Sequence, residues 1–220
     1  MCISCGARTR RRPLRKGSSG RPRRVAGNFA VRREILVFTE GEKTEDGYLL
    51  PWRRANRDTV LLEIDSFHGV PHSLVERAVA TKKAELRDQR RGRGRAHDEI
   101  WCVFDVDAHP NLAEAIQLAE AHGISLAISN PCIELWFILH FQDQTAYLSR
   151  HDAQSLAGAL LGCGKVLSRA AMDFLYGSYE DARDRAQRLD AKHEGDGSPP
   201  RSNPSSGVWL LIEAIRAQRT

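Results

Sequence analysis

The stretch Glu34-Ile-Leu-Val-Phe-Thr-Glu-Gly41 decides the fold that this sequence predicts. Residues 34–39 form a continuous apolar run with β-branched and aromatic side chains, which is typical of a strand buried on both faces. The run stops at Glu40-Gly41, and helix-forming residues follow from Glu42 to Arg54. A strand, a turn and a helix in this order predict the first unit of a parallel α/β sheet.

The same alternation continues along the chain. Strands separated by helices of ten or more residues imply right-handed crossovers, and therefore a mainly parallel sheet with helices on both faces. Ser73-Leu-Val-Glu76 is a capping box that predicts a helix start, and Asn130-Pro131 predicts another, with Asn as the cap and Pro at the first helical position. The expected strands are 34–39, 59–64, 99–104 and 124–129, and the expected helices are 42–54, 73–89, 111–122, one from 130, 152–162, 171–190 and 207–218.

Basic residues are concentrated at the beginning of the chain. The net charge is +5, yet residues 1–33 carry 11 of the 33 Lys and Arg residues and no Asp or Glu. The other 22 basic residues are outnumbered by 28 acidic ones, which leaves a net charge of −6. Low hydrophobicity gives residues 1–33 no core, so we expect a disordered arm. The arm either binds nucleic acid by releasing counterions from phosphates, or is a solvated tail or a misplaced start.

The length of 220 residues fits one α/β domain with a buried core. We expect residues 1–33 to form the basic arm and residues 34–220 to form the domain, with its core at 34–145 and a helical C-terminal part at 150–220. The candidate nucleic-acid contacts are Arg10, Arg11, Arg12, Arg23 and Arg24 in the arm, and Arg90 and Arg91 in a polar loop after the second helix.

Neither a membrane span nor a signal peptide is apparent. The longest apolar runs, such as 133–139, fall far short of the roughly 20 residues that cross a bilayer, so we expect a soluble, cytoplasmic protein. The five cysteines are an odd number, and Cys102 and Cys132 lie in apolar stretches where a thiol behaves as a small hydrophobe. The lone pair Cys2 and Cys5 lacks a second ligand pair and is weak evidence for zinc.

Three acidic residues follow predicted strands. Glu40 ends the first strand, and Asp105 and Asp107 end the third. Side chains alternate between faces along a strand, so both aspartates can point the same way while Val106 points opposite. Ligands of an open parallel sheet bind at the carboxyl ends of its strands. Three carboxylates converging there repel one another unless a cation lies between them, and Mg²⁺ is the hard cation that such oxygen ligands prefer.

Each acidic motif has an ordinary structural interpretation as well. A Glu before a Gly is often a solvated turn residue, and Asp-x-Asp is common in loops. Asp105 and Asp107 could also be the nucleophile and acid of a phosphatase, although that fold usually places the pair after its first strand. Here Ala-His-Pro110 follows the pair, after a third strand.

The motifs together resemble a known family. Glu40-Gly41 and Asp105-x-Asp107 resemble the TOPRIM motif of topoisomerases, primases and OLD-type nucleases. The longer stretches Thr39-Glu-Gly-Glu-Lys-Thr-Glu45, Phe104-Asp-Val-Asp107 and Ser129-Asn-Pro-Cys-Ile-Glu-Leu-Trp136 resemble the RloB-like family of TOPRIM-related proteins. That resemblance runs from about residue 34 to the C-terminus. It implies a role in prokaryotic phage defence by nucleic-acid cleavage, often beside an ATPase of the ABC or AAA type.

The resemblance implies roles for individual residues. Glu40 would be the TOPRIM glutamate, acting as a general base or a metal ligand, while Asp105 and Asp107 would hold Mg²⁺ or Mn²⁺. Lys43 and Glu45 extend that site, and Lys43 or a nearby Arg would counter negative charge in the transition state.

Further residues of the matching stretches have less certain roles. Glu134 lies four residues after Asn130 and is expected on the same helical face, as a metal or water ligand or as a partner of the helix N-terminus. Trp136 and His140 are expected in the core or in the wall of the site. His68, after the second strand, is a weaker candidate.

Two classes of function therefore stay open. The first is a Mg²⁺-dependent endonuclease that cleaves DNA or RNA, including tRNA, and works with a partner ATPase in abortive infection. The second is a binding or regulatory subunit that keeps the fold without catalysis. The chain has no room for the DNA-clamping domain of a topoisomerase. It also lacks a Gly-x-x-x-x-Gly-Lys-[Ser/Thr] loop, so ATP dependence would come from a partner.

Overall fold

One sheet lies at the centre of the computed structural model, which describes residues 1, 32–106 and 111–217. Contacts divide the chain into Met1–Ala30 and Val31–Thr220, and the fold below is that of the second unit. Its strand order is β2-β1-β3-β4-β5, with the first four parallel and β5 antiparallel to β4. The strands are β1 (Arg33–Thr39), β2 (Val60–Ile64), β3 (Glu99–Asp105), β4 (Ser125–Asn130) and β5 (Ser205–Ser206).

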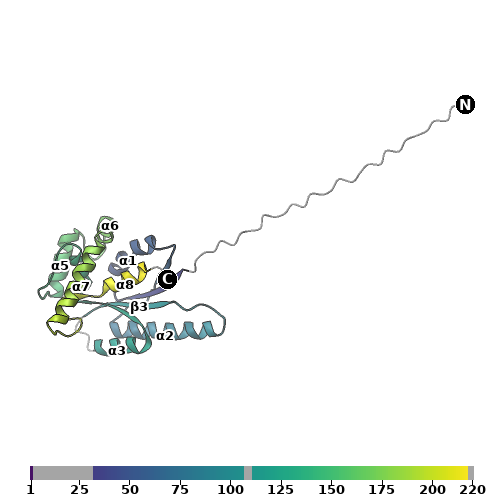
Figure 1. Ribbon diagram of the computed structural model, residues 1–220, viewed down its shortest axis with the longest axis horizontal. Coiled ribbons are helices and arrows are strands. Elements are labelled where there is room, and N and C mark those ends of the chain that lie inside the picture. The colour runs from purple at the N-terminus through teal and green to yellow at the C-terminus, as the bar shows by residue number, and fades with distance from the viewer. Residues whose placement is uncertain (2–31, 107–110, 218–220) are drawn as a thin grey trace. The chain divides into compact units, whose positions relative to one another are not determined.

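Helices cover both faces of this sheet (Figure 1), as the alternation of strands and helices predicts. Successive residues of β1 belong to different cores: Ile35 and Val37 pack with α1, α4 and the C-terminal helices, while Leu36 and Phe38 pack with α2 and α3. The α/β, mainly parallel fold is therefore confirmed. The helices are α1 (Thr44–Ala55), α2 (Pro71–Arg90), α3 (Leu112–His122), α4 (Ile133–Leu139), α5 (Arg150–Leu161), α6 (Arg169–Gly177), α7 (Tyr179–Gly195) and α8 (Val208–Arg216).

Two predicted helix starts are wrong. The helix α2 begins at Pro71 after the extended residue Val70, so the predicted capping box lies inside its first turn. Asn130 does not cap α4, because it pairs with Ser205 as the last residue of β4, and its side-chain amide donates to the carbonyl of Arg201. The helix α4 starts only at Ile133.

The C-terminal part also differs from its prediction. The single helix expected over 171–190 is two helices, α6 and α7, that meet at Ser178. The Ser178 hydroxyl donates to the carbonyl of Phe174 and lies 3.0 Å from His140 Nδ1, so it serves the bend rather than a continuous helix. The two-residue strand β5 lies between the helices expected over 171–190 and 207–218, where the sequence predicts no strand.

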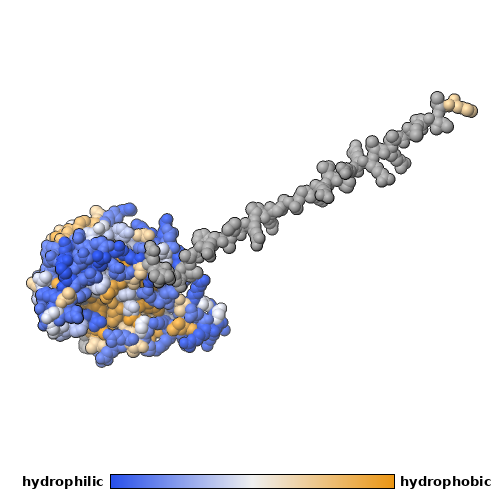
Figure 2. All heavy atoms as spheres, in the orientation of Figure 1, coloured by the Kyte–Doolittle hydropathy of each residue, from blue (hydrophilic) through white to orange (hydrophobic). Residues whose placement is uncertain are grey.

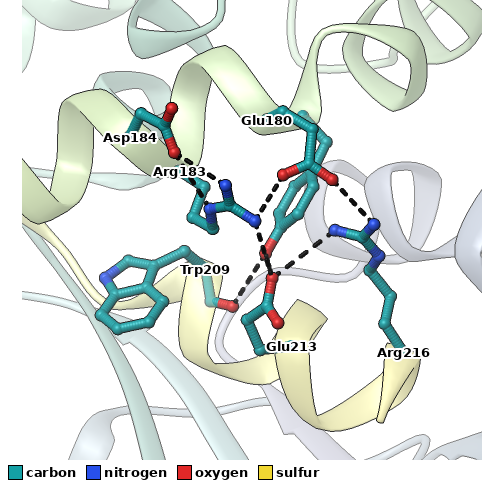
Figure 3. Close-up of polar contacts among 7 residues, drawn as sticks. Glu180, Arg183, Asp184, Trp209, Glu213 and Arg216 are labelled. Carbon is teal, nitrogen blue, oxygen red and sulfur yellow. Dashed lines mark hydrogen bonds and ion pairs between the residues drawn. The ribbon is translucent and has the colours of Figure 1, made fainter. Parts of the chain in front are cut away.

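A polar network joins α7 to α8 (Figure 3). The Tyr179 hydroxyl donates to Glu213 Oε1 at 2.7 Å, and the Arg216 guanidinium lies 4.8 Å from the centre of the Tyr179 ring. Arg183 pairs with Glu180 and Glu213 and holds the neighbouring Asp184, as the dashed lines show. Because Tyr179 is also buried in the core on that face of the sheet, the network attaches both C-terminal helices to the α/β core.

The described helices also bear on membrane insertion. Among residues 32–106 and 111–217, no helix combines the length and the apolar composition needed to cross a bilayer.

Candidate active site

A cavity of about 340 Å³ lies at the carboxyl edge of the parallel sheet. We call it the acidic cavity. Its walls come from the loop after β1, the start of α1, the end of β3, the start of α4, the first turns of α5 and the loop after α5. Its lining residues are Glu40, Gly41, Glu42, Lys43, Thr44, Glu45, Asp105, Ile133, Glu134, Arg150, Gln154 and Lys165.

Adjacent strands bring Glu40 and Asp105 together. β1 and β3 pair in parallel, with Thr39 opposite Val103, so both strands end at the same edge. The backbone N-H of Asp105 donates to Glu40 Oε2 at 3.1 Å. Glu40 is thereby held across the end of β3, as its position after the first strand predicts.

Glu45 is buried beneath the loop that leads into α1. Its side chain is 6% exposed, and its Oε1 accepts from the N-H of Gly41 at 3.1 Å. Burial raises the pKa of Glu45, the charges of Glu40 and Glu134 raise it further, and hydrogen bonds from backbone N-H groups oppose the rise. A Cβ at position 41 would lie 2.6 Å from Glu45 Oε2, so only glycine fits there without moving this carboxylate.

Asp105 is a buried carboxylate at the end of β3. It is 7% exposed, and burial raises its pKa well above the ordinary value, with the charges of Glu40 and Glu45 adding to the rise. Arg150 opposes the shift, since its Nη2 lies 3.3 Å from Asp105 Oδ2. Burial and the like-charged neighbours together outweigh the opposing effect of Arg150 on the pKa of Asp105.

Basic and amide side chains complete the lining. Lys43 and Lys165 are exposed at the cavity, and the Lys165 carbonyl accepts from the Thr44 hydroxyl at 2.9 Å. Arg150 and Gln154 both come from α5. Sequence reasoning missed Arg150, Gln154 and Lys165, because they lie in ordinary helical or loop sequence and reach the cavity only when α5 packs on α4.

The predicted site residues divide into three groups. Glu40, Lys43, Glu45, Asp105 and Glu134 line the acidic cavity together. Trp136 and His140 are buried in the core, as expected, and His68 lies beside Thr39, with Nδ1 3.2 Å from the Thr39 carbonyl. Arg90 and Arg91 are exposed at the end of α2 and do not line this cavity. Asp107, Arg10, Arg11, Arg12, Arg23 and Arg24 lie outside the described residues.

The donor set suits a hard divalent cation. Glu40, Glu45, Asp105 and Glu134 supply carboxylate oxygens, and burial and mutual repulsion raise the pKa values of Glu45 and Asp105. Within the described ranges, no three His, Cys, Asp or Glu side chains lie close enough to hold one ion together. Mg²⁺ is commonly held through one or two carboxylates, with waters completing its shell, and Glu40 and Asp105 are the carboxylates that would hold it here.

Comparison with known proteins places the chain in a family. The sequence has no match among curated proteins. It does match the family described as RloB-like protein, over residues 35–215. That range includes every residue of the acidic cavity, the helices α1 to α7 and all of α8 except its last residue. The chain therefore belongs to the RloB-like protein family.

Proposed function

We propose that this protein is a Mg²⁺-dependent nuclease that hydrolyses phosphodiester bonds of DNA or RNA. One observation carries the proposal: the lining of the acidic cavity at the carboxyl edge of the parallel sheet combines the buried carboxylates Glu45 and Asp105 with the cations Lys43, Arg150 and Lys165. A phosphodiester is an anion that needs both kinds of group, because carboxylates attract a divalent cation and basic side chains hold the phosphate.

The carboxylates would hold the cation. Glu40 and Asp105 are the proposed ligands among the described residues, Asp107 is the proposed third, and Mn²⁺ is an alternative to Mg²⁺. When bound, the ion supplies Lewis-acid polarisation of the phosphodiester and a more acidic water. Glu134, at the start of α4, lines the same cavity and would hold a water there.

The basic residues would bind the phosphate. Arg150 is held beside Asp105 by its ion pair, and its planar guanidinium can donate two parallel hydrogen bonds to phosphate oxygens. Lys43 and Lys165 are exposed point charges at the cavity. Together these side chains would offset the negative charge that develops on the phosphate oxygens in the transition state.

A second basic surface would carry the remainder of the nucleic acid. The end of α2 and the loop after it expose Arg87, Arg90, Arg91, Arg93 and Arg95. Figure 2 shows hydrophilic residues covering this end of the helix. Exposed arginines release counterions from phosphates without reading the base sequence. The basic arm, residues 1–33, is proposed to add to the same interaction.

The proposal extends to a cellular setting. We propose a role in phage defence by abortive infection, with a partner ATPase of the ABC or AAA type that controls cleavage, in the cytoplasm. A binding or regulatory subunit without catalysis is the competing function, since no three potential ligands among the described residues converge.

The test is a cleavage assay with full-length protein. Supercoiled plasmid, single-stranded oligonucleotides and tRNA are incubated with Mg²⁺, Mn²⁺ or EDTA, with and without the partner ATPase. We expect cleavage of at least one substrate that EDTA abolishes and that Glu40→Gln and Asp105→Asn each lower by about a hundredfold or more. Asp58→Asn is the matched control, because the Asp58 side chain is 91% exposed and lies outside the cavity.

Two results would contradict the proposal. Full activity in both cavity variants would remove the carboxylates from the chemistry. No metal-stimulated cleavage of any substrate, even with the ATPase present, would favour the regulatory subunit.

A further inference from the structure

A second cavity of about 200 Å³ opens beside the acidic cavity. We call it the side pocket. It lies between α4, α5 and the loop that joins α5 to α6. Its lining combines four residues that also line the acidic cavity with seven that do not. The shared residues are Thr44, Glu134, Gln154 and Lys165, and the others are Phe137, Ala157, Gly158, Leu161, Cys163, Gly164 and Leu167.

The shared residues and the remaining ones differ in chemistry. All four shared residues are polar or charged, whereas Phe137, Leu161 and Leu167 give the rest of the pocket an apolar wall. Among the described residues, the Gln154 amide makes no hydrogen bond, so both its donor and its acceptor are available at the boundary. A group that fills this pocket would therefore be apolar in its body and able to form hydrogen bonds at the end nearest the acidic cavity.

The size of the pocket limits its occupant. Sites for whole small molecules usually measure about 300–1,000 Å³, and the side pocket is smaller. One planar ring system of a larger molecule fits this description. The rest of that molecule would lie in the acidic cavity, because the two cavities share a boundary.

The wall of the pocket is preformed. The Thr44 hydroxyl donates to the carbonyl of Lys165 at 2.9 Å, which ties the α5–α6 loop to α1. Leu167 is buried against the same helix, and the Ser168 side chain then caps α6 by accepting from the N-H of Ala171. A pocket held at both ends loses little entropy when it binds a ligand.

We propose that the side pocket receives one unpaired nucleobase of the nucleic acid whose phosphate occupies the acidic cavity. This inference rests on the proposed function and deepens it. A base has an apolar ring face and hydrogen-bonding edges, and it enters a pocket only when it is not stacked in a duplex. The substrate is therefore single-stranded DNA or RNA, or a loop, rather than a continuous duplex.

Cys163 lies in the pocket wall and reports its occupancy without any cleavage. The assay uses full-length protein in which Cys2→Ser and Cys5→Ser remove the two N-terminal thiols. Of the other cysteines, Cys163 is partly exposed, whereas Cys102 and Cys132 are fully buried. Its alkylation by N-ethylmaleimide is measured in EDTA with saturating oligothymidylate or oligouridylate. We expect at least one of them to slow the reaction about fivefold or more. A duplex and an abasic oligonucleotide of equal length and charge should leave the rate unchanged.

A substitution that fills the side pocket provides the second measurement. A Cβ at Gly158 would lie 3.6 Å from the Cys163 carbonyl, an ordinary contact, so Gly158→Leu adds bulk to the wall without a backbone clash. We expect it to weaken single-strand binding about fivefold, by fluorescence anisotropy. Ala159→Leu is the matched control, because Ala159 is exposed on the same helix and does not line the pocket. Far-ultraviolet circular dichroism checks that both variants fold.

The outcomes separate the two proposals. Oligonucleotides that bind but neither protect Cys163 nor respond to Gly158→Leu would overturn the base pocket and leave the nuclease proposal intact. Equal protection by duplex or abasic strands would also overturn it, as would protection by a partner protein alone. The absence of any nucleic-acid binding would overturn the proposed function together with this inference.

Discussion

The carboxylates between α7 and α8 and those of the acidic cavity are organised in opposite ways. Glu180 and Glu213 are about half exposed, and each is paired with Arg183 and Arg216 (Figure 3). Glu45 and Asp105 are almost fully buried, and this burial raises their pKa values, with their carboxylate neighbours adding to the rise. Glu180 and Glu213 therefore both have arginine partners, although exposed ion pairs stabilise a fold only modestly.

The difference indicates which of the two regions is expected to lower the free energy of unfolding. Buried charges of like sign destabilise a fold unless something else neutralises them. Carboxylates with raised pKa values in a cavity are typical of functional sites, where activity is retained at the expense of stability. The acidic cavity has this property at Glu45 and Asp105.

Replacement of Arg150, the basic residue that pairs with Asp105, should lower the cleavage rate and is expected to have the largest effect. Arg150→Ala takes away the guanidinium that pairs with Asp105 and that we propose to bind the phosphate. We expect cleavage to fall about a hundredfold, which corresponds to the loss of one charge-stabilising donor. Steady-state cleavage rates measure this, with Arg188→Ala as the control, because Arg188 pairs with Asp143 at the surface. An unchanged rate would exclude Arg150 from the reaction.

Opposite changes in stability should follow when one carboxylate of each region is replaced. Asp105→Asn removes a buried charge, so we expect the free energy of unfolding to rise by about 1 kcal/mol. Glu213→Ala removes the acceptor of the Tyr179 hydroxyl at 2.7 Å and leaves it only the Trp209 carbonyl at 3.4 Å, so we expect a fall of about 1 kcal/mol. Urea denaturation of the metal-free proteins measures both. A loss of stability in both variants would remove the contrast between the regions.

Most of the fold is predictable from the sequence because its signals are local. Apolar runs mark β1, β3 and β4, and the left-handed Gly123 ends α3 where a glycine after the helix predicts an end. The errors arise where contacts between segments far apart in the sequence determine the local structure. Asn130 resembles a helix cap, but pairing with Ser205, far along the chain, extends β4 through it.

The candidate site likewise contains residues that the sequence predicts and residues that it does not. Glu40 and Asp105 are predictable, because each directly follows an apolar strand and parallel strands end at one edge. Arg150, Gln154 and Lys165 are not, because no periodicity or motif marks them and their place depends on how α5 packs. The side pocket depends on that packing as well, so the sequence contains no local sign of it.

Mg²⁺-dependent stabilisation tests the proposed site most directly. The melting temperature of the full-length protein is measured by calorimetry with increasing Mg²⁺, for the wild type, Glu40→Gln, Asp105→Asn and the control Asp58→Asn. A ligand that binds only the folded state raises the melting temperature with its concentration. We expect a saturable rise in the wild type and in Asp58→Asn, and none in the two cavity variants. An equal rise in all four proteins, or none in the wild type, would contradict a cation site at the carboxyl edge of this sheet.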